Sequence, residues 1–183
     1  FSICDYGARF FEKKRSLEVY DKELGWILNK SLNKSIIAKS KKGRKYEIEF
    51  FSSDKFGFRE FSKDNINKKN IVFVGDSYTA GPFASNSQMY YSHVRKILIK
   101  NNYNFDFFVM GGGGYGTLQQ LLLIKRNLDL IKPDLVVHQF CNNDFENNSL
   151  EIETNSILRN QYMFRPYLVN NLIVYKEDSR SRI

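Results

Sequence analysis

Residues 71–81 read Ile-Val-Phe-Val-Gly-Asp-Ser-Tyr-Thr-Ala-Gly, and this stretch decides the fold. Its first four residues are β-branched or aromatic, which is typical of a buried strand covered on both faces. A Gly-Asp-Ser turn directly after such a strand places a hydroxyl at the carboxyl end, where ligands bind in open α/β sheets. Ser77 is therefore the candidate nucleophile, although Asp and Ser at this point also serve simply to turn the chain.

Strand and helix patterns alternate after this stretch. Residues 87–101 carry an apolar stripe at helical spacing, and residues 105–110 form a second apolar run. A further helix is predicted from Thr117, the expected N-cap, to Pro133, and a third strand over residues 135–140. This alternation predicts a parallel α/β sheet with right-handed crossovers.

The chain before this α/β pattern reads differently. Residues 26–51 contain two extended segments around a basic run, which is the pattern of a β-hairpin. Gly57 between two phenylalanines predicts a tight turn with both rings tucked in, and Arg59 is predicted to form a surface ion pair. We therefore divide the chain into an N-terminal extension with a hairpin, residues 1–66, and an α/β domain, residues 67–183.

The composition limits the partners. The 183 residues carry a formal net charge of +8, and most of the excess lies in the N-terminal extension. The basic run at residues 39–45 suits anionic lipid or nucleic acid. A glycine inside this polar cluster favours a solvated hairpin tip instead, and no nucleic-acid motif accompanies it, so we predict no nucleic-acid partner. No apolar run reaches the roughly 20 residues that span a bilayer.

Residues that often bind metals or form disulfides are few. Cys4 and Cys141 do not make a disulfide framework. Nothing in the sequence has metal-ligand spacing, so neither a metal nor a cofactor is predicted. Of the two histidines, His93 is interpreted as a partly buried packing residue, and His138 as a packing or hydrogen-bonding residue of the third strand.

The three predicted strands all end in polar or glycine-rich loops. These loops are Gly75-Asp76-Ser77, residues 111–116 and Cys141-Asn142-Asn143-Asp144. The carboxyl ends of parallel strands share one edge of a sheet, so we expect the groups in these loops to converge. Acyl transfer needs a nucleophilic hydroxyl and donors for the developing oxyanion. Here a serine supplies the hydroxyl, and a glycine N–H and an asparagine carboxamide supply the donors.

The same three blocks resemble the SGNH/GDSL hydrolase family in order, spacing and strand context over residues 71–144. The resemblance implies a flavodoxin-like three-layer sandwich with a parallel sheet. The sequence departs from the family at Cys141, where glycine is usual, and at Val109, where asparagine is usual. The family's fourth block, Asp-x-x-His, is missing. We therefore expect an incomplete α/β domain, the front of a longer protein with its catalytic base beyond Ile183.

Roles follow from the resemblance by position. Ser77 is the implied catalytic nucleophile. The Ser77 N–H, the Gly114 N–H and the Asn143 side chain are the implied oxyanion hole. Asp76 is implied to shape the nucleophile turn, and Asp144 to fix the loop that carries Asn143.

The resemblance implies a serine hydrolase acting on acyl esters, either an esterase or an enzyme of O-acetyl transfer or deacetylation on carbohydrate. The partner is then a small-molecule or carbohydrate acyl ester. A looser similarity of residues 24–26 and 57–59 to a bacterial subgroup implies a membrane tether upstream of Phe1 and a place in the cell envelope. Two alternatives stay open. One is a catalytically inactive SGNH-like binding or interaction domain in surface polysaccharide assembly. The other is a phosphate-binding module that uses the Gly-x-Gly-x-x-Gly spacing of residues 111–116.

Overall fold

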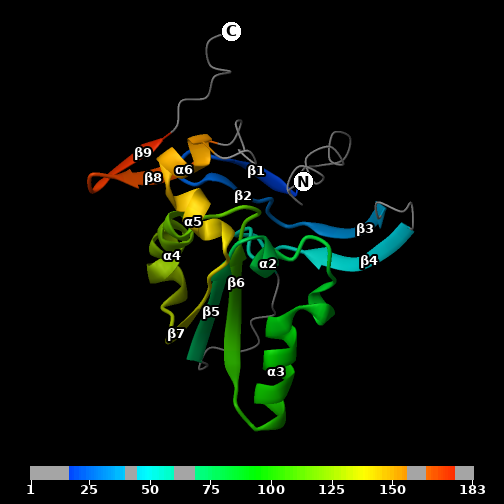
Figure 1. Cartoon of the computed structure of the whole chain (residues 1–183). Coiled ribbons are helices and arrows are strands. Elements are labelled where there is room, and N and C mark those ends of the chain that lie inside the picture. Colours follow the sequence, from blue (N-terminus) through cyan, green and yellow to red (C-terminus); the bar gives the residue numbers. More distant parts are fainter. Residues whose placement is uncertain (1–16, 40–44, 60–68, 156–163, 176–183) are drawn as a thin grey trace.

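The computed structural model describes residues 17–39, 45–59, 69–155 and 164–175 (Figure 1). Its centre is a parallel sheet with the strand order β6-β5-β7. This confirms the predicted parallel α/β sheet. The first strand lies between the second and the third, as in flavodoxin-like folds. The three strands are β5 (Lys69–Gly75), β6 (Phe105–Gly111) and β7 (Leu135–Gln139).

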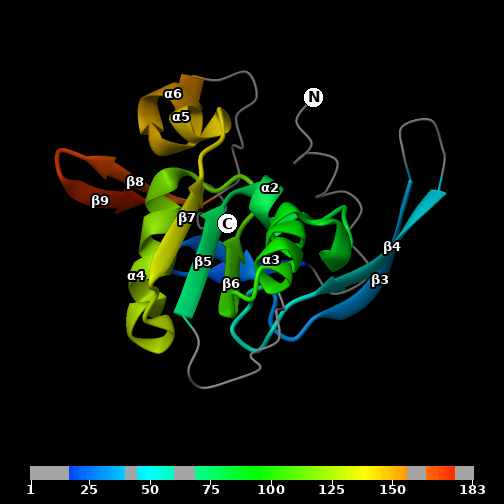
Figure 2. The same cartoon turned by 90° about the horizontal axis from the view of Figure 1, so that it is seen from below.

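Two cores lie on opposite faces of this sheet because successive strand residues point to opposite sides. Helix α4 (Thr117–Ile131) covers one face and helix α3 (Tyr90–Lys100) covers the other (Figure 2). The α4 core contains Val72, Val74, Met110, Leu122 and Leu123. The α3 core contains Ile71, Phe73, Phe107, Met89 and Tyr91. The three layers predicted from the sequence are therefore present.

Strand β7 is the outer strand of the sheet as described. It pairs with β5, and the described part of the chain places no strand on its other side. Leu135 and Val136 are 52% and 40% exposed, whereas Val72 and Val74 of β5 are buried. The sheet is thus fully covered at β5 and open at β7.

Two antiparallel hairpins precede the sheet, where one was predicted. The predicted hairpin over residues 26–51 is right for β3–β4 but wrong for its first residues, which belong to β2. The cause is a local turn in which Asp21 Oδ1 accepts the N–H groups of Glu23 and Leu24 at 3.0 and 2.9 Å. The strands are β1 (Glu18–Asp21), β2 (Gly25–Leu28), β3 (Asn33–Lys39) and β4 (Lys45–Ser52). Residues 40–44, most of the predicted basic tip, lie outside the described residues.

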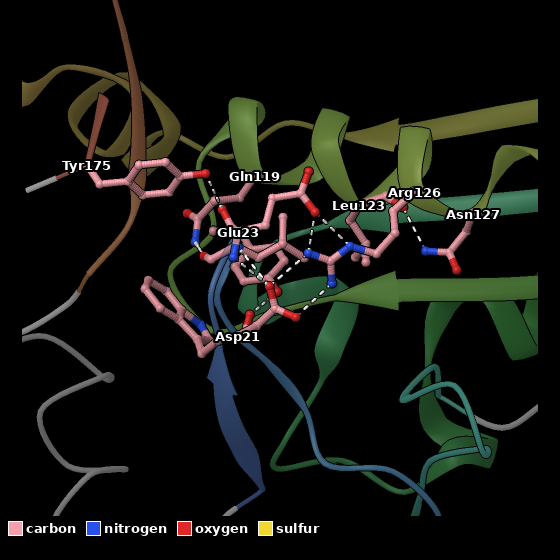
Figure 3. A network of polar contacts seen from close by, with 10 residues as sticks. Asp21, Glu23, Gln119, Leu123, Arg126, Asn127 and Tyr175 are labelled. Atoms are coloured by element: carbon pink, nitrogen blue, oxygen red, sulfur yellow. Dashed lines mark hydrogen bonds and ion pairs between the residues drawn. The ribbon is translucent and has the colours of Figure 1, made fainter. Parts of the chain in front are cut away.

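The β1–β2 hairpin is attached to α4 by a polar network (Figure 3). Arg126 on α4 donates to Asp21 Oδ2 at 2.7 Å and to Glu23 Oε2 at 2.9 Å. Gln119, also on α4, donates to the Leu24 carbonyl at 2.7 Å. These contacts join the beginning of the described chain to a helix 105 positions later in the sequence.

The remaining elements follow β7. They are the helices α5 (Asn143–Asn148) and α6 (Leu150–Asn155) and the strands β8 (Pro166–Val169) and β9 (Leu172–Tyr175). Strands β8 and β9 form an antiparallel hairpin, which projects from the body of the molecule (Figure 1). Asn170 and Asn171 at its turn have φ values of 50° and 62°, as a tight hairpin turn requires.

The starts of two helices differ from the prediction. A short 3₁₀ helix, η1 (Asn86–Gln88), precedes α3, which begins at Tyr90. The N-cap of α4 is Gly116, not Thr117, and the Gln119 side chain accepts the Gly116 N–H at 3.1 Å. Within the described ranges no helix is both long and apolar enough to cross a membrane.

Candidate active site

Ser77 is the first residue of α2 (Ser77–Ala80), a single helical turn at the carboxyl end of β5. Asp76 caps this helix, because its buried carboxylate accepts the Tyr78 N–H at 2.9 Å. Gly81 ends the helix with a left-handed φ of 54°. Asp76 therefore fixes the turn that carries the half-buried Ser77.

Arg59 holds the other end of α2. Its guanidinium donates to the carbonyls of Ala80 at 2.8 Å, Gly81 at 2.7 Å and Ala84, and to Asn86 Oδ1 at 2.6 Å. The side chain is only 1% exposed, so the predicted position of Arg59 at the surface is wrong. The planar fork of guanidinium donors instead satisfies carbonyls that a helix C-terminus leaves unpaired.

Thr79, which the sequence did not single out, ties α2 to two other elements. Its Oγ1 donates to Gln139 Oε1 of β7 at 2.5 Å and lies 3.3 Å from the Tyr90 hydroxyl of α3. The Tyr91 hydroxyl donates to the Thr79 carbonyl at 3.3 Å. The nucleophile turn is therefore fixed from both sides of the sheet edge.

The glycine-rich loop after β6 is held through the backbone of Gly113. The Gly113 N–H donates to Glu18 Oε1 at 2.7 Å, and the Gly113 carbonyl accepts from Trp26 Nε1 at 3.0 Å. Burial raises the pKa of the Glu18 carboxyl to about 7, and the Gly113 N–H partly offsets this effect. Neither Glu18 nor Trp26 was predicted to belong to the site, because both lie far away in the sequence.

Gly114 is held through its carbonyl, which accepts from Arg165 Nη1 at 2.9 Å and from Asn147 Nδ2 at 3.1 Å. Its φ of 69° is one that glycine adopts without strain. Arg165 is fully buried, and its Nε lies 3.4 Å from Glu153 Oε2. No sequence signal marked Arg165, which directly precedes β8.

Asn143 begins α5, and Asp144 fixes its loop. The fully buried Asp144 carboxyl accepts from Gln120 Nε2, Thr117 Oγ1 and the Cys141 N–H, each at 3.4 Å. Burial raises the pKa of the Asp144 carboxyl, and the Cys141 N–H partly offsets the rise. The Asn143 side chain is half-buried and makes no hydrogen bond to the residues that the structure describes.

Ser77, Gly114 and Asn143 thus follow the carboxyl ends of β5, β6 and β7, which are neighbours in one parallel sheet. Figure 1 shows α2 and α5, which begin with Ser77 and Asn143, at this edge of the sheet. The first and third loops lie close together. Burial raises the pKa of the Cys141 thiol in the third loop, and the nearby Asp76 carboxylate of the first loop adds to this rise. Among the described residues, no group bonds to the Ser77 hydroxyl, the Ser77 N–H or the Gly114 N–H. Their catalytic roles stay a prediction.

The described part of the chain brings neither histidine to Ser77. His138 Nε2 lies 2.6 Å from Gln120 Oε1, which confirms its predicted hydrogen-bonding role. His93 is exposed on α3, so the prediction that it is partly buried is wrong. Over the same residues, no group of three or more His, Cys, Asp or Glu side chains could hold a metal ion.

No family model and no curated protein matches the sequence. Among solved structures the chain is similar to AlinE4, described as an SGNH-hydrolase family esterase, at 25% identity and a TM-score of 0.40. Two single-substitution variants of that esterase match at 24% and 23% identity with the same TM-score. The similarity covers 50% of this chain and 51% of each of those chains. The chain therefore spans about half the length of these structures.

Proposed function

We propose that the protein hydrolyses or transfers acyl esters, with Ser77 as nucleophile. The observation that carries this proposal is the arrangement at the sheet edge. Three neighbouring parallel strands end in a serine hydroxyl, a glycine N–H and an asparagine carboxamide, none of them bonded to another described residue. Oxyanion holes are built from such fixed donors. The resemblance of the three sequence blocks to SGNH/GDSL hydrolases supports the same assignment.

In the proposed reaction the Ser77 oxygen attacks the ester carbonyl carbon, and its proton passes to a base. The Ser77 N–H, the Gly114 N–H and the Asn143 carboxamide bind the negative charge on the carbonyl oxygen. The ester C–O bond then breaks, the alcohol leaves with a proton, and the acyl group remains on Ser77. Water or an acceptor hydroxyl removes it. Such bases are usually imidazoles, and the contacts of the described residues assign the role to no side chain.

The substrate class that we propose is an O-acetylated carbohydrate. The support is the resemblance of the sequence blocks, which covers both esterases and enzymes of acetyl transfer. Hydrolysis and transfer differ only in whether water or a sugar hydroxyl attacks the acyl-enzyme.

The test replaces Ser77 in the full-length protein. We expect Ser77→Ala to lower the turnover of p-nitrophenyl acetate at least about 1,000-fold and to abolish labelling by a fluorophosphonate. Ser87→Ala is the matched control, because Ser87 is an exposed serine on η1, and its turnover should stay within about twofold of wild type. Wild-type turnover by Ser77→Ala would rule the proposal out.

A catalytically inactive interaction domain in surface polysaccharide assembly is the second candidate. It is favoured by the observation that neither histidine forms a hydrogen bond with Ser77 in the described part of the chain. This candidate predicts that the full-length protein binds acetylated oligosaccharide in calorimetry, while Ser77 resists the fluorophosphonate. Labelling at Ser77 would exclude it.

A further inference from the structure

The β1–β2 hairpin holds one residue of the glycine-rich loop from both sides. Strand β1 supplies Glu18, which accepts the Gly113 N–H at 2.7 Å, and β2 supplies Trp26, which donates to the Gly113 carbonyl at 3.0 Å. These partners lie 95 and 87 positions before Gly113 in the sequence. A hairpin near the start of the described chain therefore sets the conformation of the loop that contains Gly114.

The hydrogen bond from Trp26 acts on the peptide that carries the candidate oxyanion donor. The Gly113 carbonyl and the Gly114 N–H belong to one peptide unit. In a planar trans peptide these two groups point in opposite directions. Fixing the carbonyl with Trp26 therefore also fixes the direction of the Gly114 N–H.

The backbone of the glycine-rich loop needs such contacts to keep one conformation. Four consecutive glycines at residues 111–114 leave the backbone free to rotate at little steric cost. The Gly114 carbonyl is held by Arg165 and Asn147. Of the four backbone polar groups of Gly113 and Gly114, three thus have partners among the described residues. The fourth, the Gly114 N–H, has none there and is the group that the proposed oxyanion hole needs.

The indole is itself immobilised. Trp26 is 8% exposed, and the Tyr115 ring packs edge-on against it with 5.7 Å between centroids. The Tyr115 hydroxyl donates to the Trp26 carbonyl, and the Arg165 guanidinium lies 5.2 Å over the indole ring. A donor fixed in this way also polarises the acceptor peptide, which strengthens hydrogen bonds donated from its N–H side.

We propose that Trp26 is a positioning residue of the oxyanion hole, which aims the Gly114 N–H at the reacting carbonyl oxygen. The inference rests on the proposed function, because it needs an oxyanion to form at Ser77. It adds a residue of the N-terminal hairpin to a site that the sequence placed wholly in the α/β part.

The test is Trp26→Phe in the full-length protein, which keeps an aromatic ring but removes the N–H donor. Removing an oxyanion donor outright costs about 100- to 1,000-fold in kcat. Here the donor remains but loses its alignment, so we expect kcat for p-nitrophenyl acetate to fall about 10- to 100-fold. KM should stay within about threefold, because the oxyanion exists only in the transition state.

Phe56→Leu is the matched control. Phe56 packs against the same core as Trp26, and its phenyl ring carries no N–H that could hold the Gly113 carbonyl, so its substitution weakens packing without removing a donor. Its kcat should stay within about twofold of wild type, although its thermal midpoint falls. A kcat of Trp26→Phe equal to that of Phe56→Leu would overturn the inference and leave the proposed function standing. If the wild type showed no turnover that depends on Ser77, both the inference and the proposed function would be overturned.

A second measurement covers the case in which Trp26→Phe does not fold. Trp26 is the single tryptophan of these 183 residues, so their emission reports on its indole when it is excited at a wavelength that tyrosine does not absorb. If the indole holds the peptide between Gly113 and Gly114, labelling of Ser77 by a fluorophosphonate should shift the emission of the indole. The reason is that the phosphonyl oxygen then accepts a hydrogen bond from the Gly114 N–H. Ser77→Ala should show no shift. An unchanged spectrum on a fully labelled wild type would contradict the inference.

Discussion

At the scale of single residues, Glu18 is the most perturbed acid in the described structure. The half-buried Glu18 side chain lies beside Gly113, and burial raises the pKa of its carboxyl from the ordinary 4.5 to about 7. The folded protein therefore retains a proton between these two pH values that the unfolded chain releases. The contribution of Glu18 to stability is largest below about pH 4.5 and is lost as the pH rises through 7.

Replacing this acid should remove that dependence. Glu18→Gln keeps an oxygen to accept the Gly113 N–H but cannot ionise. We expect the variant to gain about 1–3 kcal/mol in free energy of unfolding over wild type at about pH 8, and little at pH 4. Urea unfolding of both proteins across this pH range measures the difference. A difference that does not change with pH would show that Glu18 titrates as an ordinary exposed acid.

Residues also differ in how well sequence predicts them. Ser77 and Asp76 were predictable because the strand, the turn and the hydroxyl are adjacent in the chain, so a local pattern contains all three. The buried position of Arg59 was not predictable, because its acceptors lie 21 to 27 positions further along the chain and a lone arginine is usually solvated. Its burial depends on the end of α2, which no local pattern brings to it.

At the scale of elements, the attachment of β1–β2 to α4 depends on exposed and half-exposed charges. Arg126 bridges Asp21 and Glu23, and the hydrogen bond from Arg126 lowers the pKa of Asp21 to about 2 (Figure 3). The side chains are 31%, 15% and 42% exposed, so water and salt screen much of the attraction. The network orients the hairpin more than it stabilises it.

Removing the bridging cation should have a small effect that depends on salt. We expect Arg126→Ala to lower the free energy of unfolding by about 1 kcal/mol at neutral pH and low salt, and by less at high salt. The loss should shrink as the pH falls through about 2, because Asp21 then becomes protonated in the folded state as well. Lys125→Ala, an exposed neighbour on α4, is the control in urea unfolding. An equal loss for the two variants would show that the bridge contributes nothing.

At the scale of the whole molecule, the sheet could be predicted from the sequence, whereas the contacts that other segments make around it could not. Local signals, namely the apolar runs at β5 and β6 and the glycines after them, were enough to predict the strands, the three layers and the shared edge. Trp26 and Arg165 reach the glycine-rich loop from 87 positions before it and 51 after it. Contacts of this range leave no periodic trace in a sequence, so the hairpins were expected only as additions.

The two sides of the sheet should also differ in stability. Strand β5 has a neighbour on each side and buried side chains, whereas β7 has one neighbour and exposed leucine and valine side chains. Amide hydrogens in residues 69–75 should therefore exchange at least about tenfold more slowly than those in residues 135–139. Hydrogen–deuterium exchange with mass spectrometry checks this. Equal protection would mean that β7 is covered on its open side in solution.

The 87 positions between Trp26 and Gly113 have a consequence for synthesis on the ribosome. At roughly 5–20 residues per second, the ribosome adds Gly113 about 4–17 seconds after it adds Trp26. During this time the segments that later bury β2 and bind the Arg59 guanidinium are also still being synthesised. We therefore expect slow translation between these two positions to prolong the exposure of apolar segments in the nascent chain.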